Sequence, residues 1–436
     1  MFQYYFLLGL RSLRRNPALT ALMVLTLAIG VAASVSTLTI LHVMSGDPIP
    51  HKSDRLFVPL MDVSQVDGYT PGMPPDDIQM TYTDARNLLK SGQGERRTAI
   101  YGISAAIEPA RKDMAVFSSE GLATTRDFFA MFEAPFFRGQ AWSEADDASG
   151  AAVVVLSRKL AEKLFGAADP IGQRVKMLET RYVVVGVLDH WVPSPHYYHL
   201  IGSDDFGVED EYLVPLSNAI LGKNPNQGST NCSTDVGPGF QAFIESECTW
   251  IQFWFETASS SDRAALQDYL SAYATEQQKL GRMKRHAPVK MYDVMEWLQL
   301  NKVVGNDSKL SASLAFAFLL LCLVNAVGLL LAKFSVRSSE VGVRRALGAS
   351  RNEIFQQFMV ETAIVGLAGG ILGLLLAFGA LQLIAMQSKQ MAIIAHMDWV
   401  MLAFTFVLSV AAAMLAGLLP TWRACQVAPA MQLKSQ

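Results

Sequence analysis

Charged side chains are scarce in four long stretches of this 436-residue chain. Charged residues make up 17% of the whole sequence and apolar residues 51%, averages that would fit an ordinary soluble protein. The charge-poor windows are residues 18–44, 310–333, 354–385 and 399–419. Each is near or above the ~20 apolar residues that cross the ~30 Å core of a bilayer. This shortage of charge excludes a wholly soluble protein and predicts four transmembrane helices.

A phosphate loop of the pattern G-x-x-x-x-G-K-S/T is absent from these residues. The chain is therefore not expected to cradle ATP in that way, and any ATP and Mg²⁺ are expected on a partner ATPase. We predict no catalytic residues and no cofactor in the chain itself.

A metal-ligand pattern is also missing. Three histidines stand close to acidic residues: His190, His196 and His199 near Asp189, Asp204 and Asp205. Their spacing fits no standard ligand set, and Pro193 and Pro195 interrupt any helix that would align them. The sequence predicts no metal site, and the acidic run 204–211 is typical of a solvated loop.

Acidic residues are in excess between the first two predicted spans, and basic residues are in excess in the rest of the chain. Residues 46–308 carry 24 Lys and Arg against 35 Asp and Glu, whereas the remainder carries 12 against 4. The basic residues flank the spans at Arg11, Arg14, Arg15, Lys333, Arg337, Arg344, Arg345, Arg351, Arg423 and Lys434, and the loop 386–397 has only Lys389. By the positive-inside rule both termini are cytoplasmic and 46–308 lies outside.

The N-terminus allows two alternatives. A cleaved signal peptide would need an apolar run of 7–15 residues, but the uncharged run from Ala18 to Met44 is longer, so we predict an uncleaved span. Residues 2–15 put Phe2, Phe6, Leu10 and Leu13 on one stripe, typical of a helix in the membrane interface. These residues could instead extend the first span.

The outer segment 46–308 has a mixed α and β pattern. Residues 152–156 form a short β run, Ser157 is a candidate N-cap for a helix, and Gly166 ends that helix. Further strands are predicted at 174–177, 182–187, 250–256 and 289–292, with a helix at 262–280. Between them, residues 190–249 are rich in Pro, Gly, Ser, Asn and acids with little periodicity, which indicates an inserted lobe.

Two of the four cysteines, Cys232 and Cys248, lie in this lobe on the predicted oxidising side. They are candidates for a disulfide, which would constrain the lobe by roughly 3 kcal/mol. Two buried free thiols are the alternative.

The cytoplasmic connection between the second and third spans predicts a short, well-terminated helix over 338–349. Ser338 is a candidate N-cap, Glu340 and Arg344 form an i,i+4 pair, and Gly348 ends the helix. Ser350 and Glu353 form a capping box for the next helix. A rigid helix joined to two spans can transmit a push from a cytoplasmic partner, and its candidate coupling residues are Glu340, Gly342, Arg344, Arg345, Leu347 and Gly348. A solvated loop whose arginines only set the topology is the alternative.

The third predicted span carries two overlapping GxxxG patterns, in Gly366, Gly369, Gly370 and Gly373. This face permits close helix packing, within the subunit or across a dimer. Glu361 falls near the cytoplasmic leaflet, about 16 Å along the helix from Ser350. Glu361 and Asn325 are intramembrane polar groups, either functional or hydrogen-bonded within the bundle.

Over nearly its whole length the chain resembles the MacB/FtsX-type permease superfamily of ABC transporters. The resemblance is carried by residues 10–17 (Leu-Arg-Ser-Leu-Arg-Arg-Asn-Pro), by 340–349 with Glu361 and Gly369-Gly370, and by 417–424 (Gly-Leu-Leu-Pro-Thr-Trp-Arg-Ala). Shorter motifs in the outer segment resemble the family's periplasmic core: Phe128-Phe129, Arg138-Gly139, Leu164-Phe165-Gly166, Asp169-Pro170-Ile171-Gly172 and Val184-Val185-Gly186-Val187. Segment 190–249 resembles it least.

The resemblance implies a permease subunit in the bacterial inner membrane, four transmembrane helices and a mixed α+β periplasmic domain inserted between helices 1 and 2. The predicted parts are an interfacial helix 1–17, TM1 18–45, a periplasmic domain 46–308 (core 46–189 and 250–308, lobe 190–249), TM2 309–334, a coupling helix 335–350, TM3 351–385, a loop 386–397, TM4 398–420 and a tail 421–436.

Expected partners are a cytoplasmic ABC ATPase, a second permease copy or paralogue, membrane lipid, and a periplasmic adaptor with an outer-membrane channel; no nucleic-acid partner is expected. MacB carries a fused ATPase domain, so the missing phosphate loop predicts that the ATPase comes from another polypeptide. The leading hypothesis is export of an unidentified substrate. Alternatives are mechanotransmission without transport, which would regulate a cell-wall hydrolase or sense an antibiotic, and lipoprotein release.

Overall fold

The structure is a computed structural model that describes residues 16–75, 78–109, 113–387 and 399–425. It divides into two units. A helical unit comprises the described residues up to Ser45 and from Val304 onward, and a globular domain spans Gly46–Val303. The predicted interfacial helix 1–17, the loop 386–397 and the tail 421–436 lie wholly or mostly outside the described residues.

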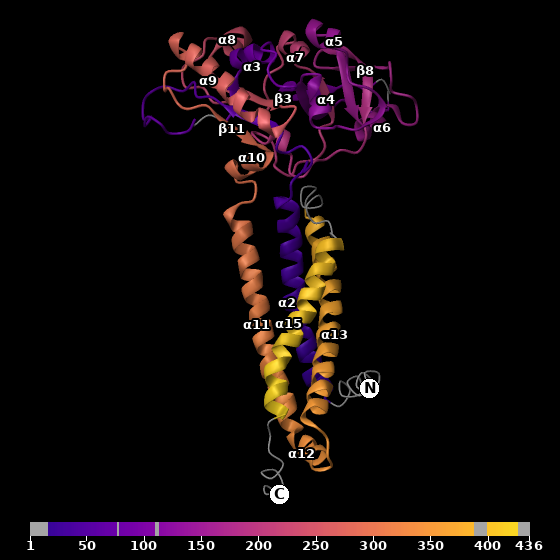
Figure 1. The fold of residues 1–436 in the computed structure, drawn as a ribbon. Helices are drawn as coiled ribbons and strands as arrows, with labels where there is room; N and C mark the ends of the chain where they lie inside the picture. The colour runs from indigo at the N-terminus through magenta and orange to yellow at the C-terminus, as the bar shows by residue number, and fades with distance from the viewer. Residues whose placement is uncertain (1–15, 76–77, 110–112, 388–398, 426–436) are drawn as a thin grey trace. The chain divides into compact units, whose positions relative to one another are not determined.

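Four long helices run side by side in the helical unit (Figure 1). They are α2 (Pro17–Ser45), α11 (Asn306–Val336), α13 (Arg351–Ala385) and α15 (Trp399–Cys425), with the short α12 (Ser338–Ala346) between α11 and α13. Three stretches, Pro17–Ser45, Ser308–Val336 and Arg351–Ala385, are long and apolar enough to cross a membrane. At the predicted fourth span the structure has the 27-residue helix α15, within which the described residues give a shorter apolar stretch, Ala413–Trp422. A fourth crossing therefore stays a prediction.

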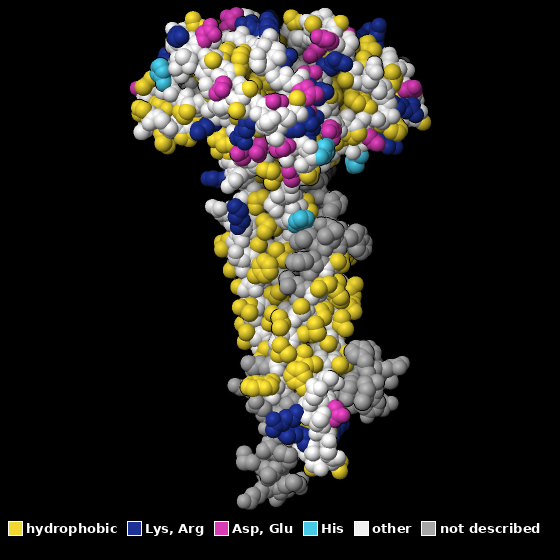
Figure 2. Space-filling view, viewed as in Figure 1, with side chains coloured by type: hydrophobic (Ala, Val, Ile, Leu, Met, Phe, Trp, Pro, Cys, Tyr) yellow, Lys and Arg dark blue, Asp and Glu magenta, His cyan; other side chains and the backbone are white. Residues whose placement is uncertain are grey.

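Hydrophobic side chains cover most of the face of the helical unit seen in Figure 2, while Lys and Arg gather at its α12 end. The outward positions of α11 include Leu314, Phe318 and Leu321, which are 61%, 40% and 55% exposed. Apolar groups that face outward along a whole helix fit a lipid environment rather than water.

The glycines of α13 lie against neighbouring helices of the same chain. A Cβ added to Gly369 would lie 2.9 Å from Cβ of Leu27, and one at Gly373 would lie 2.8 Å from Cβ of Val31, both on α2. A Cβ at Gly366 would lie 2.7 Å from Cβ of Ala413 on α15. Gly370 is also buried. The small-residue face therefore packs within the subunit, which decides between the two alternatives that the sequence left open.

The globular domain is built on one eleven-stranded mixed sheet with the order β11-β1-β10-β3-β4-β9-β6-β8-β5, in which β2 also pairs with β10 and β7 with β8. The β4–β9 and β6–β8 pairs are parallel and the other pairs are antiparallel. The strands are β1 (Leu56–Leu60), β2 (Met80–Thr81), β3 (Arg96–Ile107), β4 (Phe117–Thr124), β5 (Phe136–Gly139), β6 (Val153–Ser157), β7 (Arg174–Met177), β8 (Thr180–Leu188), β9 (Tyr212–Pro215), β10 (Thr249–Glu256) and β11 (Lys290–Asp293).

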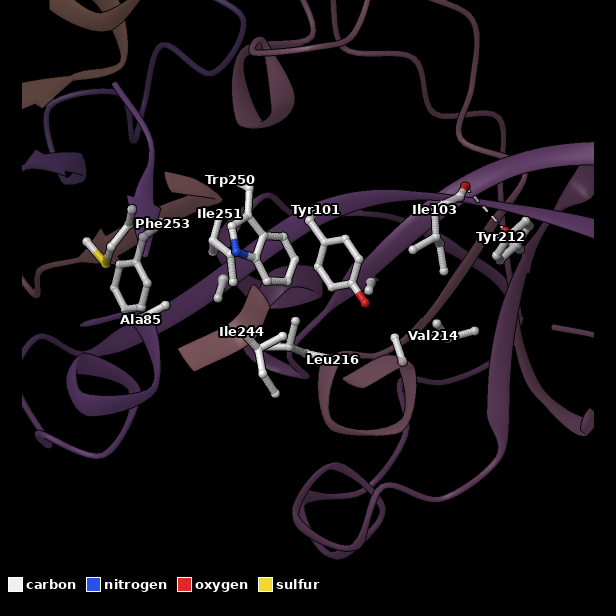
Figure 3. Packing of buried hydrophobic residues seen from close by; sticks show 14 of the residues in the cluster. Ala85, Tyr101, Ile103, Tyr212, Val214, Leu216, Ile244, Trp250, Ile251 and Phe253 are labelled. Atoms are coloured by element: carbon white, nitrogen blue, oxygen red, sulfur yellow. Dashed lines mark hydrogen bonds between the residues drawn. The ribbon is translucent and has the colours of Figure 1, made fainter. Parts of the chain in front are cut away.

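Each face of the sheet carries its own hydrophobic core because successive side chains of a strand point to opposite faces. Along β10, Ile251, Phe253 and Phe255 belong to one core and Trp254 to the other. In the first core the rings of Trp250 and Tyr101 meet edge to face, with centroids 4.8 Å apart (Figure 3). The strands β1, β6, β9 and β10 are buried on both sides, so the sheet forms the middle layer.

Helices cover both faces of this sheet. The first core contains residues of α3 (Tyr82–Leu89), α6 (Arg158–Phe165), α7 (Leu216–Leu221), α8 (Phe240–Glu245) and α9 (Arg263–Lys279). The second core contains residues of α4 (Asp127–Met131), α10 (Val294–Leu300) and the 3₁₀ turn η1 (Tyr197–His199). A short α5 (Glu144–Ser149) and a second 3₁₀ turn, η2 (Ser260–Asp262), complete the described elements.

Several local signals of the sequence have structural counterparts here. The side chain of Ser157 accepts a hydrogen bond from the amide of Leu160 and so caps α6, and Gly166, at φ 62°, ends that helix. Strands β7 and β8 pair through a turn at Leu178 and Glu179, between the strands predicted at 174–177 and 182–187. The helix predicted at 262–280 forms as α9, and its Leu266 and Leu270 are buried in the first core.

Segment 190–249 is not a separate lobe. It supplies β9, which lies in the middle of the sheet between β4 and β6, and η1, whose Tyr197 and Tyr198 are buried in the second core. The low periodicity of this segment reflects a four-residue strand between turns, because so short a strand leaves no alternating pattern to read. The structure joins Cys232 and Cys248 in a disulfide that closes the chain around α8 and ends beside β10.

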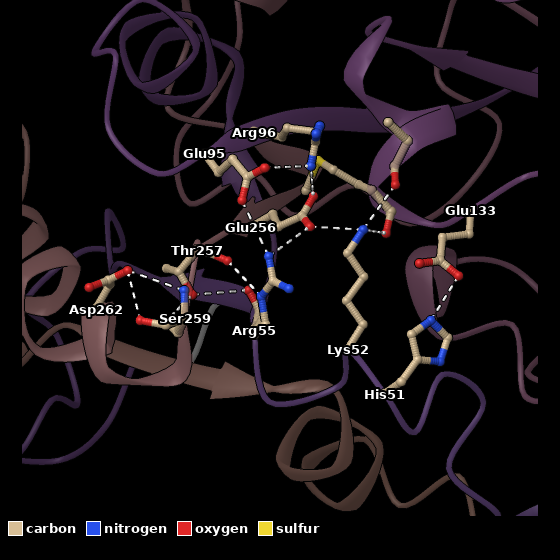
Figure 4. A network of polar contacts seen from close by, with 12 residues as sticks. His51, Lys52, Arg55, Glu95, Arg96, Glu133, Glu256, Thr257, Ser259 and Asp262 are labelled. Atoms are coloured by element: carbon tan, nitrogen blue, oxygen red, sulfur yellow. Dashed lines mark hydrogen bonds and ion pairs between the residues drawn. The ribbon is translucent and has the colours of Figure 1, made fainter.

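A buried ion cluster lies where the chain enters the sheet. Glu256, the last residue of β10, is 1% exposed and pairs with Lys52 at 2.8 Å and with Arg96 at 3.0 Å; Arg55 lies 3.6 Å away. Figure 4 shows these basic groups converging on the carboxylate. Lys52, itself 6% exposed, also donates to the carbonyl oxygens of Ala130 and Met131. One carboxylate therefore ties the entering chain to β10 and β3.

We expect Glu256→Gln to destabilise the globular domain by about 3–5 kcal/mol, because Lys52 would stay buried without its counter-ion. The matched control is Glu95→Gln, since Glu95 contacts Arg55 and Arg96 of the same cluster but is 37% exposed, and its loss should cost about 1 kcal/mol or less. Thermal unfolding of the full chain, followed by tryptophan fluorescence, measures both. Equal destabilisation by the two variants would contradict this ranking.

Gly373→Leu is expected to separate α13 from α2 and lower the melting temperature of the helical unit, because the new side chain has no space beside Val31. Gly379 lies on the same helix with nothing within 4 Å of an added Cβ, so Gly379→Leu is the control. Circular dichroism melts in detergent compare the two. A tolerated Gly373→Leu would mean that these helices do not pack closely.

Candidate functional site

The candidate site is the turn from α11 through α12 into α13, where local signals terminate each helix. Arg337 stands at the junction of α11 and α12 and is the N-cap of α12, so Ser338 is the first helical residue and not the predicted cap. At the other end, the amide of Ala349 donates to the carbonyl of Arg344 and the amide of Gly348 to that of Arg345. With Gly348 at φ 101°, this is a Schellman C-cap.

The next helix begins directly after this cap. The Ser350 side chain accepts from the amide of Glu353, while the Glu353 side chain accepts from the amide of Ser350. This capping box satisfies two amides that α13 would otherwise leave unpaired. The α12 segment therefore has a defined conformation between α11 and α13.

A chain of alternating charges fastens the three helices together. Glu361 on α13 is buried and forms ion pairs with Lys333 of α11 at 2.6 Å and with Arg337 at 2.9 Å. Glu340 of α12 lies 3.7 Å from Arg337 and 2.7 Å from Arg344. Arg344 then donates to the side-chain oxygen of Gln357 on α13 at 2.9 Å.

Apolar packing surrounds this chain of charges. The rings of Phe334 on α11 and Phe358 on α13 lie with centroids 4.3 Å apart, and Val341 and Ile354 are buried in the same cluster. Because α12 is held by both ion pairs and apolar contacts, we expect a displacement of α12 to move the adjoining ends of α11 and α13 with it.

The predicted coupling residues divide between the inner and outer sides of α12. Gly342 is buried, Glu340 and Arg344 are partly buried in the ion chain, and Arg345 is also partly buried. Leu347 is 83% exposed, and Val343, one turn earlier, is 57% exposed. Val343 was not among the predicted coupling residues, although its i,i+4 spacing from Leu347 places both side chains on one side of the helix.

The two intramembrane polar residues differ in their surroundings. Glu361 pairs with Lys333 and Arg337, two cations that sequence reasoning had explained only by the orientation of the spans in the membrane. Asn325 is exposed on α11, and its side-chain amide makes no hydrogen bond with any other residue that the structure describes. The hypothesis of a hydrogen-bonded bundle residue thus fits Glu361 and does not fit Asn325 within this chain.

Two family models match the chain. A MacB-like periplasmic core domain matches residues 20–273, and an FtsX-like permease C-terminal domain matches residues 312–429. The first match alone covers more than half of the sequence and joins α2 to the globular domain, and the second contains α12, its ion chain and the glycines of α13. The chain belongs to the MacB/FtsX-type permease family. The permease thus carries transmembrane helices and a periplasmic-type domain.

Curated relatives are longer than this permease. It is 24% identical over 425 residues to the pyoverdine export ATP-binding/permease protein PvdT of Pseudomonas fluorescens, covering 96% of this chain and 57% of that protein. It is 25% identical over 439 residues to the macrolide export ATP-binding/permease protein MacB of Marinobacter nauticus, covering 98% and 60%. The permease therefore spans somewhat more than half the length of these relatives.

Among solved structures, the periplasmic region of MacB from Actinobacillus actinomycetemcomitans matches with a TM-score of 0.36 and 12% identity. The match covers 59% of this chain and 96% of that one.

Glu361→Gln is expected to destabilise the helical unit by about 3–5 kcal/mol, because it leaves the buried Lys333 without its carboxylate. Replacing the pair together, as Lys333→Met with Glu361→Leu, should restore part of this loss. Arg351→Gln, at an exposed cation of the same helix end, is the control and should change little. Melting temperatures in detergent test the series; a double variant no better than Glu361→Gln would refute the pairing.

Proposed function

We propose that this permease couples ATP hydrolysis by a cytoplasmic ABC ATPase to motion of its outer domain, and that this motion drives export of a substrate. The observation that carries the proposal is the clamped α12, which joins two apolar helices through Glu361, Arg337 and Glu340. Both relatives described above are named as export ATP-binding/permease proteins, which supports an export role. The missing phosphate loop supports an ATPase outside these 436 residues.

In this proposal α12 lies on the cytoplasmic side and the globular domain on the periplasmic side. The net basic charge of the regions flanking the spans and the net acidic charge of residues 46–308 support this orientation. The inner membrane is the proposed location, since a cytoplasmic ATPase can reach α12 only from there.

The proposed contact with the ATPase is the exposed apolar pair Val343 and Leu347. These side chains project from α12 one turn apart, whereas Arg344 between them turns toward Glu340 and Gln357. Reversing the charge of Arg344 and Arg345 would therefore break internal bonds as well as any contact with a partner. The apolar pair offers the cleaner test.

A second permease copy is proposed to pack on α11. An unpaired amide on an apolar helix is costly in lipid, so Asn325 favours a polar partner across an interface. One turn along, Gly328 has nothing within 4 Å of an added Cβ, which leaves room for close approach of another helix. Both features belong to α11, the most exposed of the three apolar helices.

Val343→Asp with Leu347→Asp is expected to lower stimulation of the co-purified ATPase at least about tenfold, because burial of two large apolar side chains contributes more than 1.4 kcal/mol to docking. The control is Met386→Asp, an 81% exposed apolar residue just after the other end of α13. ATPase rates in lipid nanodiscs, with the melting temperature as a check on folding, provide the measurement. Normal stimulation in the double variant would overturn the assigned contact.

A further inference from the structure

A second site of interest lies in the globular domain, far along the sequence from α12. A cavity of about 420 Å³ opens between β3, β4 and the segment 196–228. This volume falls within the range of small-molecule sites. Its lining is more polar than apolar and comes from β3 and β4 and from segment 190–249, which resembles the family least.

The residues of fixed charge that line the cavity are all acidic. Glu120, Asp204 and Asp210 line it, and none of the described lining residues is Lys or Arg. Glu120 and Asp204 are exposed, and their carboxylates make no hydrogen bond or ion pair with any described side chain. Two negative charges therefore stand available at the mouth of the cavity.

The imidazole of His199 also lines the cavity and is the observation that points to a ligand. His199 is 6% exposed, yet its ring forms no hydrogen bond with a residue in the described ranges. Buried polar groups usually have partners, so this ring is a vacant hydrogen-bonding group. Burial lowers its pKa to about 4, so the ring is neutral at pH 7 and adds no positive charge.

The second imidazole, His196, offers an acceptor. The Tyr198 hydroxyl donates to Asp210 at 2.8 Å and lies 2.6 Å from Nε2 of His196. Because the hydroxyl has one proton, Nε2 must donate its own proton to the hydroxyl oxygen, and Nδ1 of the neutral ring is then an acceptor. Burial lowers the pKa of His196 and keeps this form at neutral pH.

Two glycines of the cavity lining lie against the rings and the backbone around them. A Cβ at Gly207 would lie 3.1 Å from the carbonyl oxygen of Asp204 and 3.2 Å from Nδ1 of His196. A Cβ at Gly102 would lie 2.6 Å from the carbonyl oxygen of Gln227 and 3.2 Å from Cε1 of His199, so a side chain at either position would collide with the cavity wall. Together these groups present carboxylates and acceptor nitrogens, which match N–H donors that carry positive charge.

We propose that this cavity binds a small ligand bearing positively charged amino groups. The ammonium groups would lie against Glu120 and Asp204, and a ligand N–H would donate to Nδ1 of His196. This site goes beyond the proposed coupling function and does not depend on it, since binding is measured without ATP.

The test is isothermal titration calorimetry of the full chain in detergent at pH 7.5 with 1,5-diaminopentane. We expect one binding site for the diamine and no binding of 1,5-pentanediol, which has the same chain length without charge. Glu120→Gln with Asp204→Asn should weaken the diamine at least about tenfold, because two opposing charges are lost without disturbing any internal bond.

The matched control is Asp268→Asn with Glu276→Gln, two exposed acids on α9, which should leave the affinity within about twofold. An unchanged affinity in the Glu120/Asp204 variant, or equal loss in the control, would overturn the proposed site. Binding of Ca²⁺ or Zn²⁺ at the same residues with no binding of the diamine would overturn the ligand class. None of these results changes the expected effect of Val343 and Leu347 on the ATPase.

Discussion

The buried carboxylate of Glu361 is the interaction on which the helical unit depends. It lies in an apolar cluster and is held by Lys333 of α11 and by Arg337 at the junction of α11 and α12. A buried ion pair of this kind contributes little net stability compared with apolar packing, but its geometry permits few alternatives. The pairing fixes how α11, α12 and α13 meet, so α12 has a defined position relative to the two long helices and is not a flexible linker.

The globular domain uses the same principle around Glu256. One buried carboxylate collects Lys52, Arg55 and Arg96, which come from the entering chain and from β3. In both units, a single buried acid gathers basic groups from other segments of the chain. Each such acid therefore fixes how the segments around it meet.

The sequence predicted the elements that are defined by local chemistry. Ser157 capping α6, Gly348 ending α12 and the box of Ser350 and Glu353 all follow from residues within four positions of one another. The long apolar helices follow from composition. These features need no tertiary information, because the interactions that specify them lie within one turn of helix or one stretch of chain.

Features that depend on distant residues were not predictable in the same way. Strand β9 has four residues, and its place between β4 and β6 is set by pairing with residues that lie 56 to 91 positions earlier, so 190–249 looked like an insertion. In the sequence, Lys333 and Arg337 were explained by the orientation of the spans in the membrane, so they were not identified as partners of Glu361. The exposure of Val343 depends on which side of α12 packs on α13.

The central position of β9 has a consequence for how this family can diversify. The turns on either side of β9 can change in length and composition without disturbing the sheet, whereas residues 212–215 must keep the register that joins its two halves. Residues 202–210 before β9 and residues 227 and 228 after it line the 420 Å³ cavity. Substitutions at these positions would change the cavity and leave the pairing of β9 with β4 and β6 as it is.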